Sequence, residues 1–117
     1  MNIMIVDDDA GVTVAAQAIL EDAGHVVSVH LNALGTMARI LNERPDLVLL
    51  DIEMPSLNGL QLAGIVRRRM SATTVILYSG KSNDELEVLA ASCGAHGWLC
   101  KDTPPRKMLA YIARFAS

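Results

Sequence analysis

Polar side chains follow the short apolar runs of this sequence, and five of them are candidates for chemistry: Asp7, Asp8, Asp51, Ser79 and Lys101. Carboxylates that gather closely repel one another, which raises their pKa values unless a cation lies between them. Carboxylate oxygens are hard ligands, so the expected cation is Mg²⁺, or Mn²⁺, and not zinc. One carboxylate then remains free to attack an activated phosphoryl group, whose oxygens an ammonium and a hydroxyl could hold. The residue types therefore predict phosphoryl transfer onto an aspartate.

The apolar runs have the pattern of strands that are buried on both faces. They are short and unalternating, as in a parallel sheet, and they span residues 3–6, 26–27, 47–50, 75–77 and 98–100. Stretches with helical spacing lie between them, so we predict an α/β fold, (βα)₅, with helices on both faces of a doubly wound five-stranded parallel sheet. The carboxyl ends of such strands meet at one edge of the sheet. This fold would bring the five candidates together.

Apolar rows at i, i+3, i+4 and i+7 predict which helix faces meet the sheet. The rows that we expect in the core are Ala16, Ile19, Leu20 and Ala23; Leu34, Met37, Ala38 and Leu41; Leu86, Leu89, Ala90 and Cys93; and Leu109, Ile112, Ala113 and Ala116, with a shorter row of Leu62, Ile65 and Val66. Asp9 is the expected N-cap of the first helix, and Ser82 with Glu85 forms a capping box for the fourth. Thr103 followed by Pro104 predicts the start of the fifth.

Composition excludes several classes of protein. The 117 residues suit one domain, residues 1–117, and the net charge of −3 argues against a nucleic-acid-binding surface. The two cysteines lie in apolar stretches without the spacing of metal ligands, which is typical of a cytoplasmic protein. No run approaches the ~20 apolar residues that a membrane helix needs.

Four segments carry a family resemblance in their order along the chain. They are residues 5–8 (IVDD), residues 45–55 with Asn58 and Gly59 (PDLVLLDIEMP…NG), Ser79 with Gly80, and residues 94–101 (GAHGWLCK). Together they resemble the receiver domains of bacterial two-component response regulators over essentially the whole chain. The resemblance implies a flavodoxin-like sheet with the strand order 2-1-3-4-5.

The resemblance also implies a role for each residue of the predicted site. Asp51 would be the phospho-acceptor and a ligand of Mg²⁺. Asp8 would be the direct carboxylate ligand of the metal, Asp7 its partner through water, and Glu53 a ligand through its backbone carbonyl. Lys101 would pair with the phosphoryl group.

Two further positions match the switch residues of receivers. Ser79 occupies the Ser/Thr switch position and Trp98 the aromatic one, so phosphorylation would draw Ser79 toward the phosphoryl oxygens and turn Trp98 inward. The partner that supplies the phosphoryl group would be a histidine kinase or a phosphotransfer protein. The surface of the fourth helix, fifth strand and fifth helix would control an output such as transcription. Such a domain is a switch and not an enzyme, since at most it catalyses its own phosphorylation and dephosphorylation.

Three features depart from the usual receiver pattern or refine it. Trp98 is bulkier than the more usual Tyr or Phe. Asp102 stands where many receivers have a proline after a cis peptide bond, which costs about 2.5–4 kcal/mol before other residues, so we expect a trans bond or a cis bond held by its surroundings. The segment 101–105 (KDTPP) is similar to receivers of the NarL/FixJ type, which are attached to DNA-binding domains.

The fifth helix carries a second apolar row besides its predicted core row. This row consists of Met108, Ile112 and Phe115, with Tyr111 beside it. A helix that is apolar around so much of its circumference usually covers something besides its own sheet. We therefore predict a homodimer or output contact through these residues, with no direct contact to nucleic acid or membrane.

Two alternatives come from other functional classes. One is a receiver-like interaction module that is never phosphorylated, against which the five intact site residues argue. The other is a small phosphohydrolase that acts on an external substrate through an aspartyl-phosphate, for which 117 residues leave little room. Within the receiver hypothesis, Glu53 and Lys81 flank the phosphoryl site and would control how fast water removes the phosphoryl group.

Overall fold

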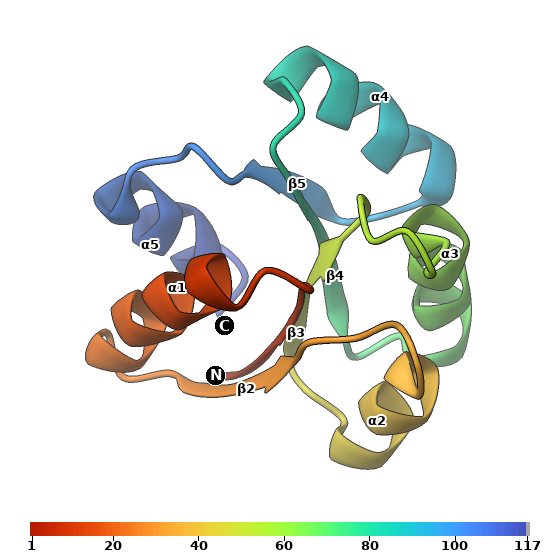
Figure 1. Ribbon diagram of the computed structural model, residues 1–117, viewed down its shortest axis with the longest axis horizontal. Coiled ribbons are helices and arrows are strands. Elements are labelled where there is room, and N and C mark those ends of the chain that lie inside the picture. Colours follow the sequence, from red (N-terminus) through yellow and green to blue (C-terminus); the bar gives the residue numbers. More distant parts are fainter. Residues whose placement is uncertain (117) are drawn as a thin grey trace.

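A computed structural model of the chain describes residues 1–116, in which five strands alternate with five helices (Figure 1). The strands are β1 (Asn2–Val6), β2 (Val26–His30), β3 (Leu47–Asp51), β4 (Thr74–Ser79) and β5 (Gly97–Cys100). The helices are α1 (Ala10–Asp22), α2 (Thr36–Glu43), α3 (Gly59–Arg69), α4 (Asn83–Cys93) and α5 (Pro105–Ala113). None of these helices has the length and apolar character needed to cross a membrane.

All five strands form one parallel sheet in the order β2-β1-β3-β4-β5. This is the predicted architecture, including the strand order that the family resemblance implied. Every residue of β3 is buried, because helices cover both faces of the sheet at its centre. The register pairs Asp51 with Tyr78 and Ser79 with Cys100, so the ends of β3, β4 and β5 lie side by side.

The helices form two layers. Figure 1 shows α1 and α5 next to each other on one face of the sheet, with α2, α3 and α4 on the other. Successive residues of each strand alternate between the two layers. On β3, Leu47 and Leu49 face α1 and α5, whereas Val48 and Leu50 face the other helices. Asp51 and Tyr78 continue the rows that face α1 and α5.

The predicted core face is correct for α1, α3 and α4 and only partly correct for α5, where Ile112 of the predicted row is completely buried. On α5 the buried side chains are Met108 and Ile112, and Leu109 is only half-buried. The row that we expected to cover a partner is therefore the one that packs on the sheet. Ala113 and Ala116, which we expected in the core, are exposed, because the larger side chains of the competing row bury more apolar area.

A similar error affects α2. Leu34 is 87% exposed and precedes the helix, while Thr36 and Ile40 are its buried residues. Ile40 is completely buried because it points at the sheet, whereas Leu41 lies one position further round and is exposed. The start of α5 also differs by one residue, since Pro104 is the N-cap and Pro105 the first helical residue.

The predicted N-caps Asp9 and Ser82 are confirmed, whereas the Glu85 carboxylate of the predicted capping box pairs with Lys81 instead. The side chain of Asp9 accepts a hydrogen bond from the Val12 amide at 3.1 Å, and Ser82 Oγ accepts one from the Glu85 amide at 3.2 Å. No cis peptide bond occurs within the described residues, so the Lys101–Asp102 bond is trans.

Candidate phosphoryl-acceptor site

Three carboxylates meet at the carboxyl edge of the sheet. Asp7 and Asp8 directly follow β1, and Asp51 is the last residue of β3, its neighbour in the sheet. One ligand atom from each lies within 4.8 Å of the others. Asp7 and Asp51 are buried, with 0% and 2% of their surface exposed, whereas Asp8 is exposed to solvent. We call these three residues and Lys101 the carboxylate corner.

Lys101 reaches the buried carboxylates from the end of β5. Its Nζ lies 2.8 Å from Asp7 Oδ2 and 3.3 Å from Asp51 Oδ2. Burial opposes the charge of Lys101, but the hydrogen bonds and negative charges of the two aspartates outweigh it and raise the pKa of the lysine. Lys101 is therefore the cation that offsets part of the repulsion between the two carboxylates.

Asp51 is held by its neighbours on both oxygens. Its Oδ1 accepts a hydrogen bond from the Glu53 amide at 2.8 Å, while Oδ2 faces Lys101. Burial raises the pKa of Asp51, and the nearby charge of Asp7 adds to the increase, although the Glu53 amide and Lys101 act in the opposite direction. These contacts fix the direction in which the Asp51 carboxylate points.

The backbone around Asp51 depends on a close approach by α3. A Cβ added at Gly59 would lie 3.0 Å from the Cα of Ile52 and 3.1 Å from the carbonyl oxygen of Asp51. Asn58 caps the helix, since its side chain accepts a hydrogen bond from the Gln61 amide at 3.1 Å. The Asn58–Gly59 pair of the sequence motif thus brings the start of α3 against the residues that carry the carboxylate.

Ser79 ends β4 and is completely buried. Its Oγ accepts a hydrogen bond from the Lys81 amide at 3.1 Å, and its carbonyl accepts one from the Lys101 amide at 2.7 Å. The second bond ties the backbone of Ser79 to that of Lys101. A displacement of either residue therefore also displaces the end of the neighbouring strand, β4 or β5.

Trp98 lies on β5 and is half-buried, with two hydrogen bonds that hold it. Its indole Nε1–H donates to Asn83 Oδ1 at 3.2 Å, and its backbone amide donates to the Tyr111 hydroxyl at 3.1 Å. The Tyr111 hydroxyl occupies the space over Gly97, where an added Cβ would lie only 2.0 Å from it. Trp98 thus connects β5 to both α4 and α5.

The donor set suits a divalent cation such as Mg²⁺. All three candidate ligands are carboxylates, which are hard oxygen donors. In addition, Asp7 Oδ2 is buried, and its one close polar contact is the ion pair with Lys101. A carboxylate oxygen has more than one lone pair, so Asp7 Oδ2 can serve as a ligand, directly or through water, beside this ion pair.

The structure brings together the site residues that the sequence predicted and adds others. Asp7, Asp8, Asp51 and Lys101 form the corner, and Ser79 lies beside it at the end of β4. Sequence reasoning gave no role to Tyr78, although Lys101 Nζ lies 5.3 Å from the centre of its ring. No signal in the sequence marks Tyr78, because its place beside Asp51 comes from the register of β3 and β4.

Comparison with known proteins gives the family. The model of the response regulator receiver domain matches residues 3–113, which is nearly the whole chain. The chain therefore belongs to the response regulator receiver family, and the fold and the acidic pocket agree with that assignment.

Individual relatives agree with this assignment. The chain is 39% identical over 112 residues to the transcriptional regulatory protein RstA of Escherichia coli, an alignment that covers 94% of this chain and 46% of that protein. The BeF3-activated N-terminal receiver domain of Klebsiella pneumoniae RstA superposes with a TM-score of 0.91 at 29% identity and 100% coverage of both chains. The chain thus spans less than half the length of the curated RstA protein.

A third relative bears on the subfamily. The response regulator DrrB of Thermotoga maritima, described as an OmpR/PhoB homologue, superposes with a TM-score of 0.81 at 27% identity, with 97% of this chain and 51% of DrrB covered. The similarities to RstA and DrrB therefore do not support the NarL/FixJ type that residues 101–105 predicted. The segment that suggested it is short, and beyond Lys101 it consists of the connection from β5 to the start of α5.

Proposed function

We propose that the domain accepts a phosphoryl group on Asp51 from a histidine kinase or a phosphotransfer protein. The observation that carries this proposal is the geometry of the carboxylate corner, in which Lys101 Nζ lies 3.3 Å from Asp51 Oδ2. The ammonium is thereby placed beside the oxygen that would become bonded to phosphorus. An ammonium at this position stabilises the negative charge of the transferring group.

Asp8, Asp51 and the backbone carbonyl of Glu53 are the residues that would hold Mg²⁺, with Asp7 contributing through water. When bound, the metal would neutralise the negative charge on the phosphoryl oxygens during transfer. Asp8 is exposed and can exchange water for a cation, while the buried pair of Asp7 and Asp51 provides the fixed part of the site.

The transfer itself is a displacement at phosphorus. A carboxylate oxygen of Asp51 forms the new O–P bond while the N–P bond of a phosphohistidine breaks, and the imidazole keeps the electron pair and takes a proton from water. Lys101 would bind one phosphoryl oxygen. Ser79 Oγ, whose present contact is the Lys81 amide, would turn to bind another. No other covalent change is required of the chain, which fits a switch and not an enzyme with an external substrate.

The phosphorylated state would be communicated through Ser79 and Trp98 to the surface formed by α4, β5 and α5. A groove of about 490 Å³ lies there, lined by Trp98 and Tyr111 among others. On its α5 side the groove is lined by two basic residues, Lys107 and Arg114, and on its α4 side by Asn83. A basic rim of this kind favours a partner with acidic groups through charge complementarity.

This surface replaces the helix-five contact that the sequence predicted. Met108 and Ile112 are buried against the sheet and cannot meet a partner. Tyr111 and Phe115 are half-buried, and they line the groove. We propose that an output domain or a second copy of the chain binds here. Because RstA is a transcriptional regulator that is longer than this chain, the proposed output is transcription, in the cytoplasm.

The experiment that tests the function is a measurement of intact mass. The protein is incubated with acetyl phosphate and Mg²⁺, and we expect a gain of one phosphoryl group that is absent with EDTA and absent in Asp51→Asn. The matched control is Asp46→Asn, because Asp46 is an exposed carboxylate at the opposite edge of the sheet that bonds the Asn2 amide. Gain of mass by Asp51→Asn would contradict the assignment of the acceptor.

The same experiment separates the alternatives. A non-phosphorylated interaction module gains no mass from acetyl phosphate or from any phosphorylated kinase. A phosphohydrolase releases inorganic phosphate over many turnovers from a small phosphate ester, whereas the proposed switch takes no phosphoryl group from such an ester. The Glu53 and Lys81 hypothesis is tested in the same material, since substituting either residue should change the rate at which the phosphoryl group is lost.

A further inference from the structure

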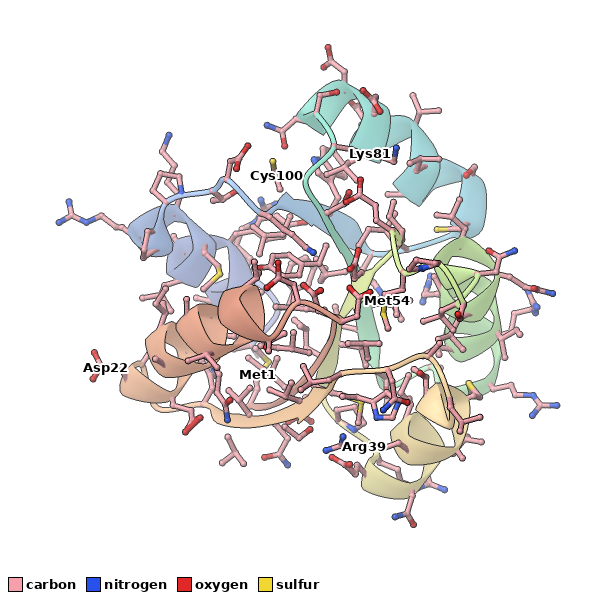
Figure 2. All side chains as sticks on the ribbon, viewed as in Figure 1. Met1, Asp22, Arg39, Met54, Lys81 and Cys100 are labelled. Atoms are coloured by element: carbon pink, nitrogen blue, oxygen red, sulfur yellow. The ribbon has the colours of Figure 1, made fainter. Side chains whose placement is uncertain are left out.

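Lys101 reaches Asp51 across an intervening strand. Lys101 follows β5 and Asp51 ends β3, and β4 lies between them in the sheet. Neighbouring strands are about 4.8 Å apart, so the backbones of β3 and β5 are separated by about 10 Å, and the side chains of Lys101 and Asp51 have to bridge this gap together. Figure 2 labels Cys100, the last residue of β5, directly before Lys101. The long aliphatic side chain of Lys101 can adopt many other conformations, so a further contact is needed to stabilise the one that passes over β4.

Tyr78 is the β4 residue over which the lysine passes. It pairs in register with Asp51 on one side and with Leu99 on the other. Its ring faces the α1 and α5 layer, the same layer as the row that leads to Lys101. Lys101 Nζ lies 5.3 Å from the centre of the ring, a distance at which the face of an aromatic ring attracts a cation. Tyr78 is 4% exposed, so water screens this attraction little.

The ring differs from the other two partners of Lys101 in one respect. Asp7 and Asp51 are also the carboxylates that would take part in binding a divalent cation. A bound divalent cation would attract the same carboxylate oxygens and so weaken their attraction for the Lys101 ammonium. The cation would also repel the ammonium directly. The ring has no part in the metal site, so its attraction for Lys101 persists when the carboxylates are shared.

We propose that Tyr78 is a positioning residue for Lys101: the face of its ring keeps the ammonium over Asp51 when the carboxylates bind metal and receive the phosphoryl group. This inference rests on the proposed function and adds a residue to its machinery. It depends on the ring and not on the hydroxyl, so Tyr78→Phe should retain the effect. Tyr78→Leu keeps an apolar side chain in the core and removes the aromatic face.

Nuclear magnetic resonance tests the contact without any phosphoryl transfer. A lysine ε-methylene group beside an aromatic face has its proton resonances shifted upfield by the ring current. We expect this shift for Lys101 in wild type and Tyr78→Phe, both without metal and with saturating Mg²⁺, and its loss in Tyr78→Leu. If Mg²⁺ moves the Lys101 resonances of the wild type to the values of an exposed lysine such as Lys107, the proposal is overturned.

The rate of phosphoryl uptake tests the consequence. With acetyl phosphate and Mg²⁺, the rate constant of Tyr78→Leu should be lower than that of the wild type by about 3- to 30-fold, the range that a desolvated cation–π contact supplies. Tyr78→Phe should remain within about twofold of the wild type. Ile76→Val is the control for a loosened core, since Ile76 lies on the same face of β4 but away from Lys101, and its rate should be unchanged.

Each failure has its own signature. Equal rates in wild type and Tyr78→Leu overturn the positioning role while the proposed function stands. An equal loss of rate in Ile76→Val also overturns it, because the effect would then come from core packing. If the wild type takes up no phosphoryl group at all, the proposed function fails, and the resonance shifts alone decide whether Tyr78 positions Lys101.

Discussion

The carboxylate corner and the α4–β5–α5 surface are held together by different kinds of interaction. In the corner, two almost fully buried carboxylates share one lysine whose side chain is only 16% exposed. On the α4–β5–α5 surface, Trp98 is held by single uncharged hydrogen bonds to Asn83 and Tyr111, around an open groove. Buried charges are costly to separate, whereas an exposed neutral hydrogen bond contributes about 1 kcal/mol or less.

These different interactions suit the different tasks of the carboxylate corner and the α4–β5–α5 surface. A group that must meet a phosphoryl donor in one geometry is best held rigidly before the donor arrives. A surface that must change between two states needs contacts that break at little cost. Substitutions in the corner should therefore act on stability and chemistry, and substitutions on the surface should act on the signal with little effect on stability.

Lys101→Met gives the largest effect on stability. Without the ammonium, Asp7 and Asp51 face each other unneutralised, and we expect the metal-free protein to lose about 3–5 kcal/mol of unfolding free energy. Addition of Mg²⁺ should recover part of this loss, because a divalent cation replaces the missing positive charge. Urea unfolding with EDTA and with Mg²⁺ measures both quantities.

The control for this prediction is Lys81→Met. Lys81 has a side chain 39% exposed and an ion pair of 3.9 Å with Glu85, so its loss should change stability by about 0.5 kcal/mol or less. If Lys101→Met were no more destabilising than Lys81→Met, the contrast between the buried corner and the exposed surface would be wrong.

Asp8→Asn should weaken Mg²⁺ binding while leaving the fold intact. Asp8 is the exposed member of the carboxylate cluster, so without metal the unfolding free energy should change by about 0.5 kcal/mol or less. The affinity for Mg²⁺ should fall by at least about tenfold, since a charged ligand becomes neutral. Isothermal titration gives the affinity and urea unfolding the stability. A large stability loss without change of affinity would place Asp8 in a structural role.

Asn83→Ala probes the other region. The substitution removes the acceptor for the Trp98 indole N–H, an exposed contact, and should reduce stability by about 1 kcal/mol or less. The emission of Trp98, the only tryptophan of the chain, should nevertheless change clearly, and so should its response to Mg²⁺ with beryllofluoride. Asp84→Ala, the neighbouring residue on α4, is the matched control. An unchanged emission spectrum in Asn83→Ala would contradict the role of this bond in holding the indole.

The sequence predicted the sheet well because the strands β1, β3 and β4 each have a strong local signal. The edge strand β2 is the weaker case, since its predicted run covers only residues 26–27, and Val26, expected to be buried, is 68% exposed. Runs such as Leu47–Leu50 are apolar and short, and only a parallel sheet covered on both faces buries them completely. The helix faces were harder. On α5 two apolar rows compete, and the choice between Met108 and Leu109 depends on how the helix lies on the sheet, which the spacing of residues does not define.

The site shows the same limit. Asp7, Asp51 and Lys101 could be predicted because each follows a strand and carries a charge. Tyr78 and Tyr111 could not, because tyrosine in or near a strand is ordinary core chemistry, and their roles arise from register and from the absent side chain of Gly97. Contacts of that kind become visible only when strands and helices have been placed beside one another.

The smallest predicted effect concerns pH, and it tests the surface through His96, which lines the groove. Both ring nitrogens of His96 face donors: the Val75 amide at 3.0 Å from Nδ1 and Arg67 Nη1 at 2.9 Å from Nε2. Burial, and then the charge of Arg67, lowers the pKa of His96 below its usual value near 6.5. Protonation is therefore more favourable in the unfolded chain.

A lowered pKa in the folded state means that the histidine supports stability above pH 6.5 and that this support is lost as the pH falls. Because His96 is exposed, the loss between pH 7.5 and 5.5 should be about 0.5 kcal/mol or less. His96→Gln, which does not titrate, should show a correspondingly smaller decrease in urea unfolding over that range. His25, whose pKa is also lowered by burial and by the positive N-terminus, titrates in both proteins and cancels in the comparison. If the wild type became more stable than His96→Gln as the pH fell, the imidazole would have an acceptor in the folded state, and the arrangement around Arg67 would be wrong.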